Sequence, residues 1–165
     1  MALIDTMLQE LEEEAKTTRR VLERVPEQLD WRPHQKARTL GELAMHVAIV
    51  PGAVAEFVAA PSPAQAPDFT DPILKTASEL VPTLDQSIAK AKKVLGGMED
   101  ADLLATWRLM QGERELFAGP RIRMLRAIML NHWYHHRGQL SVYLRALDVP
   151  LPSIYGPSAD ENPFA

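Results

Sequence analysis

Three of the five histidines in the chain lie within five positions, in the stretch Asn131–Gln139, which reads NHWYHHRGQ. On an α-helix, His132 and His136 are four residues apart, so their rings are neighbours on one face. Neutral imidazoles at this spacing can bind a divalent zinc, nickel, copper or iron ion. Two donors are too few for a tight site, so we expect a third donor from a facing helix.

Two further histidines could supply that donor. His46 lies in an apolar segment, within about 40° of the apolar stripe of its own helix, so we expect it to face inward. His34 lies in a proline-containing connector and is the weaker candidate. His135 sits about 60° from His132 and could bind in place of His136. Spacing alone leaves that choice open.

Three polar residues are candidates for orienting ligands or handling protons. Glu42 lies one turn before His46 and could be a fourth ligand or a base, but the pattern TLGE from Thr39 also fits a helix capping box. Gln139 and Tyr143 lie on the same helical face as the two paired histidines. Either could support catalysis, and either equally suits a core or hydrogen-bonding role.

Four segments with helical periodicity are expected to position these side chains. The second should kink at Pro51, because proline removes one backbone hydrogen bond. Residues 27–38 are a connector, residues 61–72 a loop with four prolines, and the tail from Asp148 has no helical period. The helices cover residues 3–25, 40–59, 79–95 and 120–147. We therefore predict one domain over residues 1–165, an all-α four-helix bundle.

A short β-hairpin is predicted before the last helix. Residues 107–110 and 113–117 flank Gln111-Gly112, and their alternation about two residues is typical of a hairpin. An isolated hairpin is only marginally stable, so this one should pack on the helices.

Composition excludes several classes of protein. The 165 residues contain no cysteine, which excludes disulfides, iron–sulfur clusters and a cysteine nucleophile. Any nucleophilic sulfur must therefore arrive with a substrate. The net charge is 18 − 22 = −4, which disfavours nucleic acid as a partner. No signal sequence and no apolar run approaching the ~20 residues of a membrane span are apparent, so we expect a cytoplasmic protein without membrane contact.

The last helix carries five arginines and no carboxylate between Arg121 and Leu147. A metal held by three neutral histidines would keep its full positive charge there, which favours an anionic or thiolate guest at its open position. The alternative is that the arginines pair with acidic residues on other helices, such as Glu10–Glu14. Arg137 lies about 140° from His132 and is expected to point outward.

Three stretches of the sequence resemble one family. They are WRPH at residues 31–34 followed by TLGELAMH at 39–46, HWYHHRGQ at 132–139, and the tail PLPSIYGPSAD at 150–160. Together they resemble the DinB/YfiT-like family of metal-dependent proteins. The resemblance implies an up-down-down-up four-helix bundle, commonly a homodimer, with a divalent ion, often nickel or zinc. The matching ligand positions are His46, His132 and His136, which decides against His135.

The resemblance also guides the functional hypotheses, because characterised relatives include transferases and isomerases that use low-molecular-weight thiols. The first hypothesis is an enzyme in which the metal keeps an open position, where water or an external thiol becomes a nucleophile toward a small-molecule substrate. The alternative is a non-catalytic, metal-dependent ligand-binding or stress-associated dimeric bundle. A third possibility is a structural bundle whose histidines belong to the core.

Overall fold

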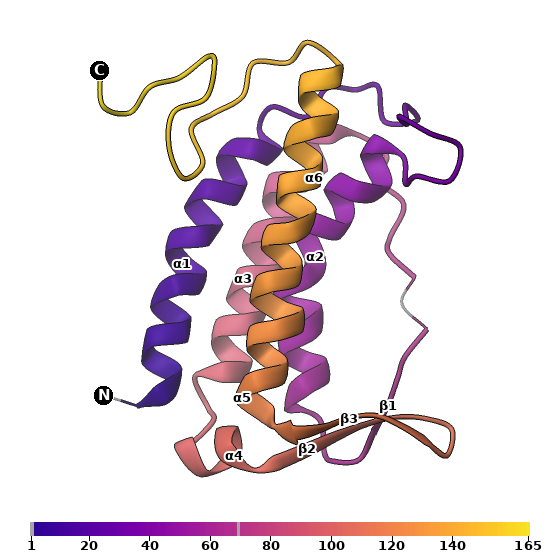
Figure 1. Ribbon diagram of the computed structural model, residues 1–165, viewed down its shortest axis with the longest axis vertical. Helices are drawn as coiled ribbons and strands as arrows, with labels where there is room; N and C mark the ends of the chain where they lie inside the picture. Colours follow the sequence, from indigo (N-terminus) through magenta and orange to yellow (C-terminus); the bar gives the residue numbers. More distant parts are fainter. Residues whose placement is uncertain (1, 69) are drawn as a thin grey trace.

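The computed structural model describes residues 2–68 and 70–165, and it is built mainly of helices that run side by side (Figure 1). The first and last helices run in one direction and the two middle ones in the other, which confirms the up-down-down-up bundle. The helices are α1 (Leu3–Leu22), α2 (Leu40–Ala59), α3 (Leu80–Leu95) and a last helix made of α5 (Arg121–Met124), the π-helical η2 (Leu125–Asn131) and α6 (His132–Ala146).

The packing order of the helices places α2 and α6 next to each other. Helix α3 packs between α1 and α2, and α6 contacts both α2 and α1. The chain between α2 and α3 includes the 3₁₀ turn η1 (Ala77–Glu79) and runs back along the length of the bundle, so α2 and α3 are parallel (Figure 1). This arrangement brings the segment with His46 against the segment with the paired histidines.

Helix α1 ends three residues earlier than the periodicity predicted. It stops at Leu22, and the backbone N–H groups of Arg24 and Val25 donate to Val21 and Leu22, three residues back. Pro26 explains this end, because a residue before proline is driven out of the helical region of φ/ψ space.

Helix α2 is the central element of the core. Its first turn is closed by a capping box: the Glu42 N–H donates to Thr39 Oγ1 (3.1 Å), and Glu42 Oε2 accepts from the Thr39 N–H (2.7 Å). By length and composition α2 is apolar enough to cross a membrane, so the expectation that no such run exists was wrong. The apolar residues cover several faces because α3 and α6 both pack on them, as in the core helix of a soluble protein.

The predicted hairpin is present, with its turn displaced by one residue. Strands β2 (Thr106–Gln111) and β3 (Arg114–Pro120) are antiparallel and joined through Gly112-Glu113, where Gly112 has a left-handed φ of 59°. A third strand that the sequence did not reveal, β1 (Ala64–Gln65), pairs parallel with β2. The hairpin follows the short helix α4 (Asp100–Leu104), and Trp107 anchors it by packing edge-on against Phe57 of α2.

The last helix contains a π-helical segment directly before His132. In a π-helix the backbone bonds span five residues, so η2 changes the angular phase between Arg121 and His132. Angles calculated for one continuous α-helix therefore hold within α6 but not across Asn131.

Arg137 corrects a second expectation, because its side chain is buried and not solvent-exposed. It does point away from the histidines, but that side of α6 is covered by α1 and by the C-terminal tail. Its guanidinium lies 2.7 Å from a carboxylate oxygen of Glu14, donates to Thr18 Oγ1 at 3.0 Å and contacts the Tyr155 hydroxyl. A helix packed on two sides has two interior faces, which helical angles alone do not reveal.

Candidate metal centre

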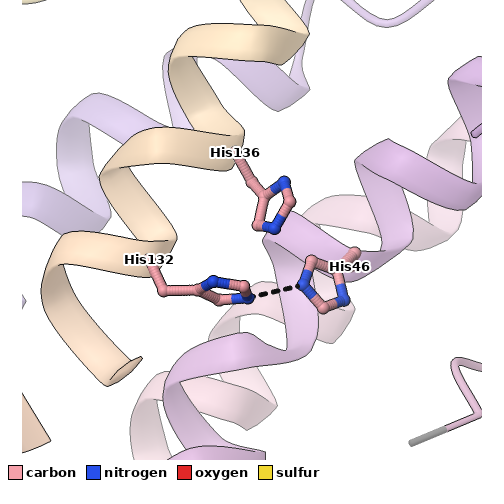
Figure 2. A group of neighbouring side chains, drawn as sticks. All are labelled: His46, His132 and His136. Atoms are coloured by element: carbon pink, nitrogen blue, oxygen red, sulfur yellow. Dashed lines mark hydrogen bonds between the residues drawn. The ribbon is translucent and has the colours of Figure 1, made fainter. Parts of the chain in front are cut away.

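Three imidazole rings meet at the contact between α2 and α6 (Figure 2). One nitrogen from each of His46, His132 and His136 lies within 4.8 Å of the other two. The Nε2 atoms of His46 and His132 are 3.0 Å apart. The ring of His136 stands edge-on to both others, with centroids 4.6 Å from His46 and 4.3 Å from His132. The three rings therefore face one common point.

The outer nitrogens of two rings are held by acceptors from different parts of the chain. His46 Nδ1 lies 2.8 Å from Asp71 Oδ2, and His136 Nδ1 lies 2.7 Å from Gln139 Oε1. A proton on Nδ1 that is donated to such an acceptor leaves the Nε2 lone pair free for a cation. Both contacts thus aim the ligand nitrogens at the common point.

Asp71 is the residue that the sequence analysis missed. It lies in the proline-rich loop between α2 and α3, and its Oδ2 also accepts from Arg38 at 2.6 Å. An acidic residue in a loop without periodicity has no sequence signal that separates it from a solvated surface charge. Only the return path of this loop along the bundle brings its carboxylate to His46.

The rings are electrostatically suited to bind a cation. Burial, together with the charges of His46 and His135, lowers the pKa of His132 below its ordinary value. Burial lowers the pKa of His136 to about 4, although its hydrogen bond with Gln139 acts in the opposite direction. Both rings are therefore neutral near pH 7, which is the form that binds a metal.

The carboxyl of Asp71 stays ionised beside them. Burial raises the pKa of Asp71, but the hydrogen bonds from His46 and Arg38 outweigh burial and leave the pKa below its ordinary value. A carboxylate next to the outer nitrogen of a ligand histidine increases the basicity of that ligand and offsets part of the charge of a cation.

These residues fit a divalent transition metal. Two imidazole nitrogens on one tetrahedral ion at 2.0–2.1 Å are roughly 3.3 Å apart, and the Nε2 atoms of His46 and His132 are 3.0 Å apart. All three donors are imidazole nitrogens, which suit zinc, nickel, copper and iron better than calcium or magnesium. The site is half-buried, so a guest can reach it.

A cavity of about 370 Å³ opens beside two of the histidines. Its apolar wall is formed by α2 and by Ile128 of η2, and its polar rim carries Asp68, Asp71 and Arg38. His46 and His132 both line it. This volume is in the range of sites for small molecules.

The other residues singled out from the sequence lie in different places. Glu42 is exposed, is engaged in its capping box and lines a neighbouring cavity, whereas the histidine cavity is lined without it. The Tyr143 hydroxyl donates to the Arg38 carbonyl at 3.3 Å, so it braces the connector before α2. His34 is exposed and accepts from the backbone of Lys36.

His135 is also outside the cluster. Its exposed ring stands edge-on to His136, with centroids 5.0 Å apart, but it is not one of the three converging donors. The spacing ambiguity between His135 and His136 is thus decided by which ring faces α2.

The alternative interpretation of the arginines, that they pair with acidic residues on other elements, is confirmed for three of the five. Three of them pair with carboxylates on α1 or the tail: Arg126 with Glu10, Arg137 with Glu14, and Arg145 with Asp160. Arg121 donates to backbone carbonyls at the end of α2, and Arg123 lies over the Phe117 ring. These charges are neutralised or placed away from the histidines because the helix has several packed faces.

The comparisons agree with the fold and the motifs. The DinB family model matches residues 1–162, and the chain belongs to the DinB family. The chain is 28% identical over 163 residues to the uncharacterized protein YrdA of Bacillus subtilis (strain 168), covering 96% of this chain and 91% of that protein.

Solved structures share the fold at lower identity. A DinB-like protein from Bacillus cereus ATCC 10987 aligns with a TM-score of 0.66 and 22% identity, over 90% of this chain and 95% of the other. The DinB-like protein YjoA from Bacillus subtilis aligns with a TM-score of 0.66 and 18% identity, over 90% and 97% of the two chains.

Proposed function

We propose that this protein is a metal-dependent enzyme in which His46, His132 and His136 hold a divalent cation, nickel or zinc. The reaction class is the attack of a thiol or a water on a small-molecule substrate, as in a thiol-S-transferase or a hydrolase. The observation that carries this proposal is the convergence of three imidazoles at the edge of a cavity.

A divalent cation with three protein ligands supplies an open Lewis-acid position that lowers the pKa of a thiol or a water. The chain contains no cysteine, so the sulfur of a thiol reaction comes from an external low-molecular-weight thiol. The protein itself contributes the positions of the three imidazole rings, the apolar wall of the cavity and a proton acceptor.

Ring orientation is the task of Asp71 and Gln139. Each contacts the Nδ1 atom of one ligand histidine, at 2.8 Å and 2.7 Å, and so holds the Nε2 atom toward the shared point. Of the three polar residues proposed from the sequence, Gln139 is in contact with a ligand. Tyr143 acts one step further out, through the connector that carries Arg38.

Proton acceptance falls to Asp68. The cavity has two carboxylates, and Oδ2 of Asp71 is already occupied by His46 and Arg38. Asp68 is exposed on the same rim and has no ion pair or hydrogen bond within residues 2–68 and 70–165. A free carboxylate on the rim of the cavity can take the proton that a thiol or a water releases.

Metal analysis of protein purified without a histidine tag tests the centre directly. We expect about one equivalent of a divalent transition metal per chain, and a cobalt-substituted form whose visible spectrum changes when a thiol is added. Protein that binds no metal, or a metal with four protein ligands, overturns the enzyme proposal.

A panel of thiols and activated esters tests the reaction. Turnover that requires the metal and falls in Asp68→Asn supports the enzyme. The second candidate, a non-catalytic ligand-binding protein, is favoured by the apolar wall on α2. A ligand-binding protein would bind one compound tightly in the cavity and would turn over neither the thiols nor the esters.

Two further proposals concern the setting of the protein. We place it in the cytoplasm, since α2 is used in the core of the bundle. We also propose that the protein is a homodimer, because its motifs resemble those of a family whose members are commonly homodimers. Light scattering of the untagged protein tests the dimer.

A further inference from the structure

Pro51 leaves one backbone acceptor unused inside α2. In an α-helix, the N–H of residue 51 donates to the carbonyl of residue 47. Proline has no N–H, so the Val47 carbonyl loses its partner. Both residues are buried, and a buried carbonyl without a partner is unfavourable by a free energy comparable to a lost hydrogen bond.

The missing donor comes from the last helix. The indole Nε1–H of Trp133 donates to the Val47 carbonyl oxygen at 2.8 Å, and the Trp133 side chain is fully buried. The bond runs between α2 and α6. The carbonyl that Pro51 leaves without a donor in α2 therefore accepts a hydrogen bond that links the two helices.

This link lies at the level of the histidines. Val47 follows His46 in the chain, and Trp133 follows His132. The Nε2 atoms of these histidines are 3.0 Å apart (Figure 2). Sliding α6 along α2 by one residue would break the indole bond and would also move His132 by about 1.5 Å relative to His46.

We propose that Trp133 is a positioning residue for the metal centre, and that Pro51 serves it by freeing the Val47 carbonyl. The bond sets the position of α6 along the axis of α2. His46 on α2 therefore meets His132 and His136 on α6 without rearrangement. This inference rests on the proposed metal centre. The residues act on the metal only through the helices that carry its ligands.

Trp107 provides a matched control within the same chain. Its indole N–H also donates to a backbone carbonyl, that of Ala60 directly after α2, at 3.2 Å, and its side chain is also fully buried. Ala60 follows the last residue of α2, where carbonyls lack helical partners in any case. That bond ties the β-hairpin to the end of the helix and sets no histidine position.

The experiment compares Trp133→Phe with Trp107→Phe. Both variants remove one indole donor and part of one buried ring, so both should lower the melting temperature. Zinc affinity, measured by competition with a chromophoric chelator, should fall roughly tenfold in Trp133→Phe, as for other groups that orient metal ligands. It should stay within about twofold of the unaltered protein in Trp107→Phe, with an unchanged cobalt spectrum.

Pro51→Ala separates positioning from simple stability. This substitution restores a backbone N–H that can donate to the Val47 carbonyl, so that carbonyl stays satisfied when Trp133 is removed. The double variant Pro51→Ala, Trp133→Phe should therefore lose less stability relative to Pro51→Ala than Trp133→Phe loses relative to the unaltered protein. Its zinc affinity should still be roughly tenfold below that of Pro51→Ala.

The outcomes are distinct. If zinc affinity recovers together with stability in the double variant, Trp133 is only a core residue and the inference fails. It fails equally if both tryptophan variants bind zinc alike. If the unaltered protein binds no divalent metal, the proposed function fails as well. A Trp133→Phe chain that does not fold leaves the double variant, measured against Pro51→Ala, as the deciding comparison.

Discussion

The two sides of α6 both bury nitrogen-rich side chains, but they satisfy them differently. On the side facing α1, Arg137 is held by the Glu14 carboxylate, the Thr18 hydroxyl and the Tyr155 hydroxyl, with the Tyr134 ring 5.3 Å away. The protein itself provides the partners for this charge.

On the side facing α2, the rings of His46, His132 and His136 face one another. The Nε2 atoms of His46 and His132 are at hydrogen-bonding distance, 3.0 Å, and such a pair requires one ring to donate and the other to accept. A cation can satisfy all three. A buried charge with a full set of protein partners indicates architecture, whereas three imidazoles that converge beside a cavity suit a binding site.

The largest effect on stability is expected at Arg137, on the side of α6 that faces α1. Arg137→Met leaves Glu14 with the Tyr155 hydroxyl but without its cationic partner in a largely buried position, and should lower the free energy of unfolding by about 3 kcal/mol. Urea denaturation measures it. Glu14→Gln in the same chain should restore part of the loss, and Arg126→Met, which breaks an exposed pair with Glu10, should change stability by no more than about 1 kcal/mol.

The same variant sharpens the contrast between the sides. Folded Arg137→Met protein should bind zinc nearly as well as the unaltered protein. A large drop in zinc affinity without unfolding would show that the two sides of α6 are not separate.

The next effect is on the histidine side. His132→Phe removes one of three donors and should weaken zinc binding by at least about 100-fold, because outer groups alone change affinity 10–100-fold. Stability without metal should change little, since the ring is replaced by one of similar size. His135→Phe is the control, because its exposed ring is outside the cluster. Equal zinc affinity in the two variants would contradict the assigned ligands.

A smaller effect is expected one step from the metal. Asp71→Asn keeps an acceptor for His46 Nδ1 but removes the charge, and should weaken zinc binding roughly tenfold in a chelator competition. Asp68→Asn, on the same loop, should leave zinc affinity unchanged because its carboxylate contacts none of the three rings. If both variants weaken zinc alike, the loop acts through its overall charge and not through His46.

The smallest effect is a pH dependence of the stability contributed by Glu10, which pairs with Arg126. The hydrogen bond from Arg126 lowers the pKa of Glu10 despite burial, and Tyr134 adds to the shift. A lowered carboxyl pKa contributes stability that is fully present above the unfolded value of 4.5 and is lost as the pH falls through the folded pKa. Glu10→Gln should therefore be less stable than the unaltered protein at pH 6, by under about 1 kcal/mol, and equally stable near pH 2. A difference that grows toward acid pH would contradict this assignment.

Much of the fold was predictable because it depends on local chemistry. Helical periodicity and the capping box at Thr39 predicted α2 and α3 within a residue or two. The hairpin was predicted from alternation about Gly112, although the positive φ of that glycine puts the turn one residue later. Strand β1 was not predictable, because two residues carry no periodicity.

The three histidines of the candidate site were predictable from the sequence, but the residues that contact them were not. The i, i+4 pair on α6 and one inward histidine on α2 were readable from spacing, and the resemblance to the DinB/YfiT-like family identified the same three residues. Of the two interpretations of Glu42, a metal-site residue or a capping-box residue, the structure confirms the capping box.

The sequence by itself determined which residues could hold a cation, because ligand type and helical spacing are properties of a single segment. The tertiary structure alone decided what surrounds them. Asp71 reaches His46 through a returning loop, Trp133 reaches Val47 across the bundle, and Arg137 is buried because α1 covers it. These contacts join residues far apart in the chain, so they follow from helix packing, which no local pattern records.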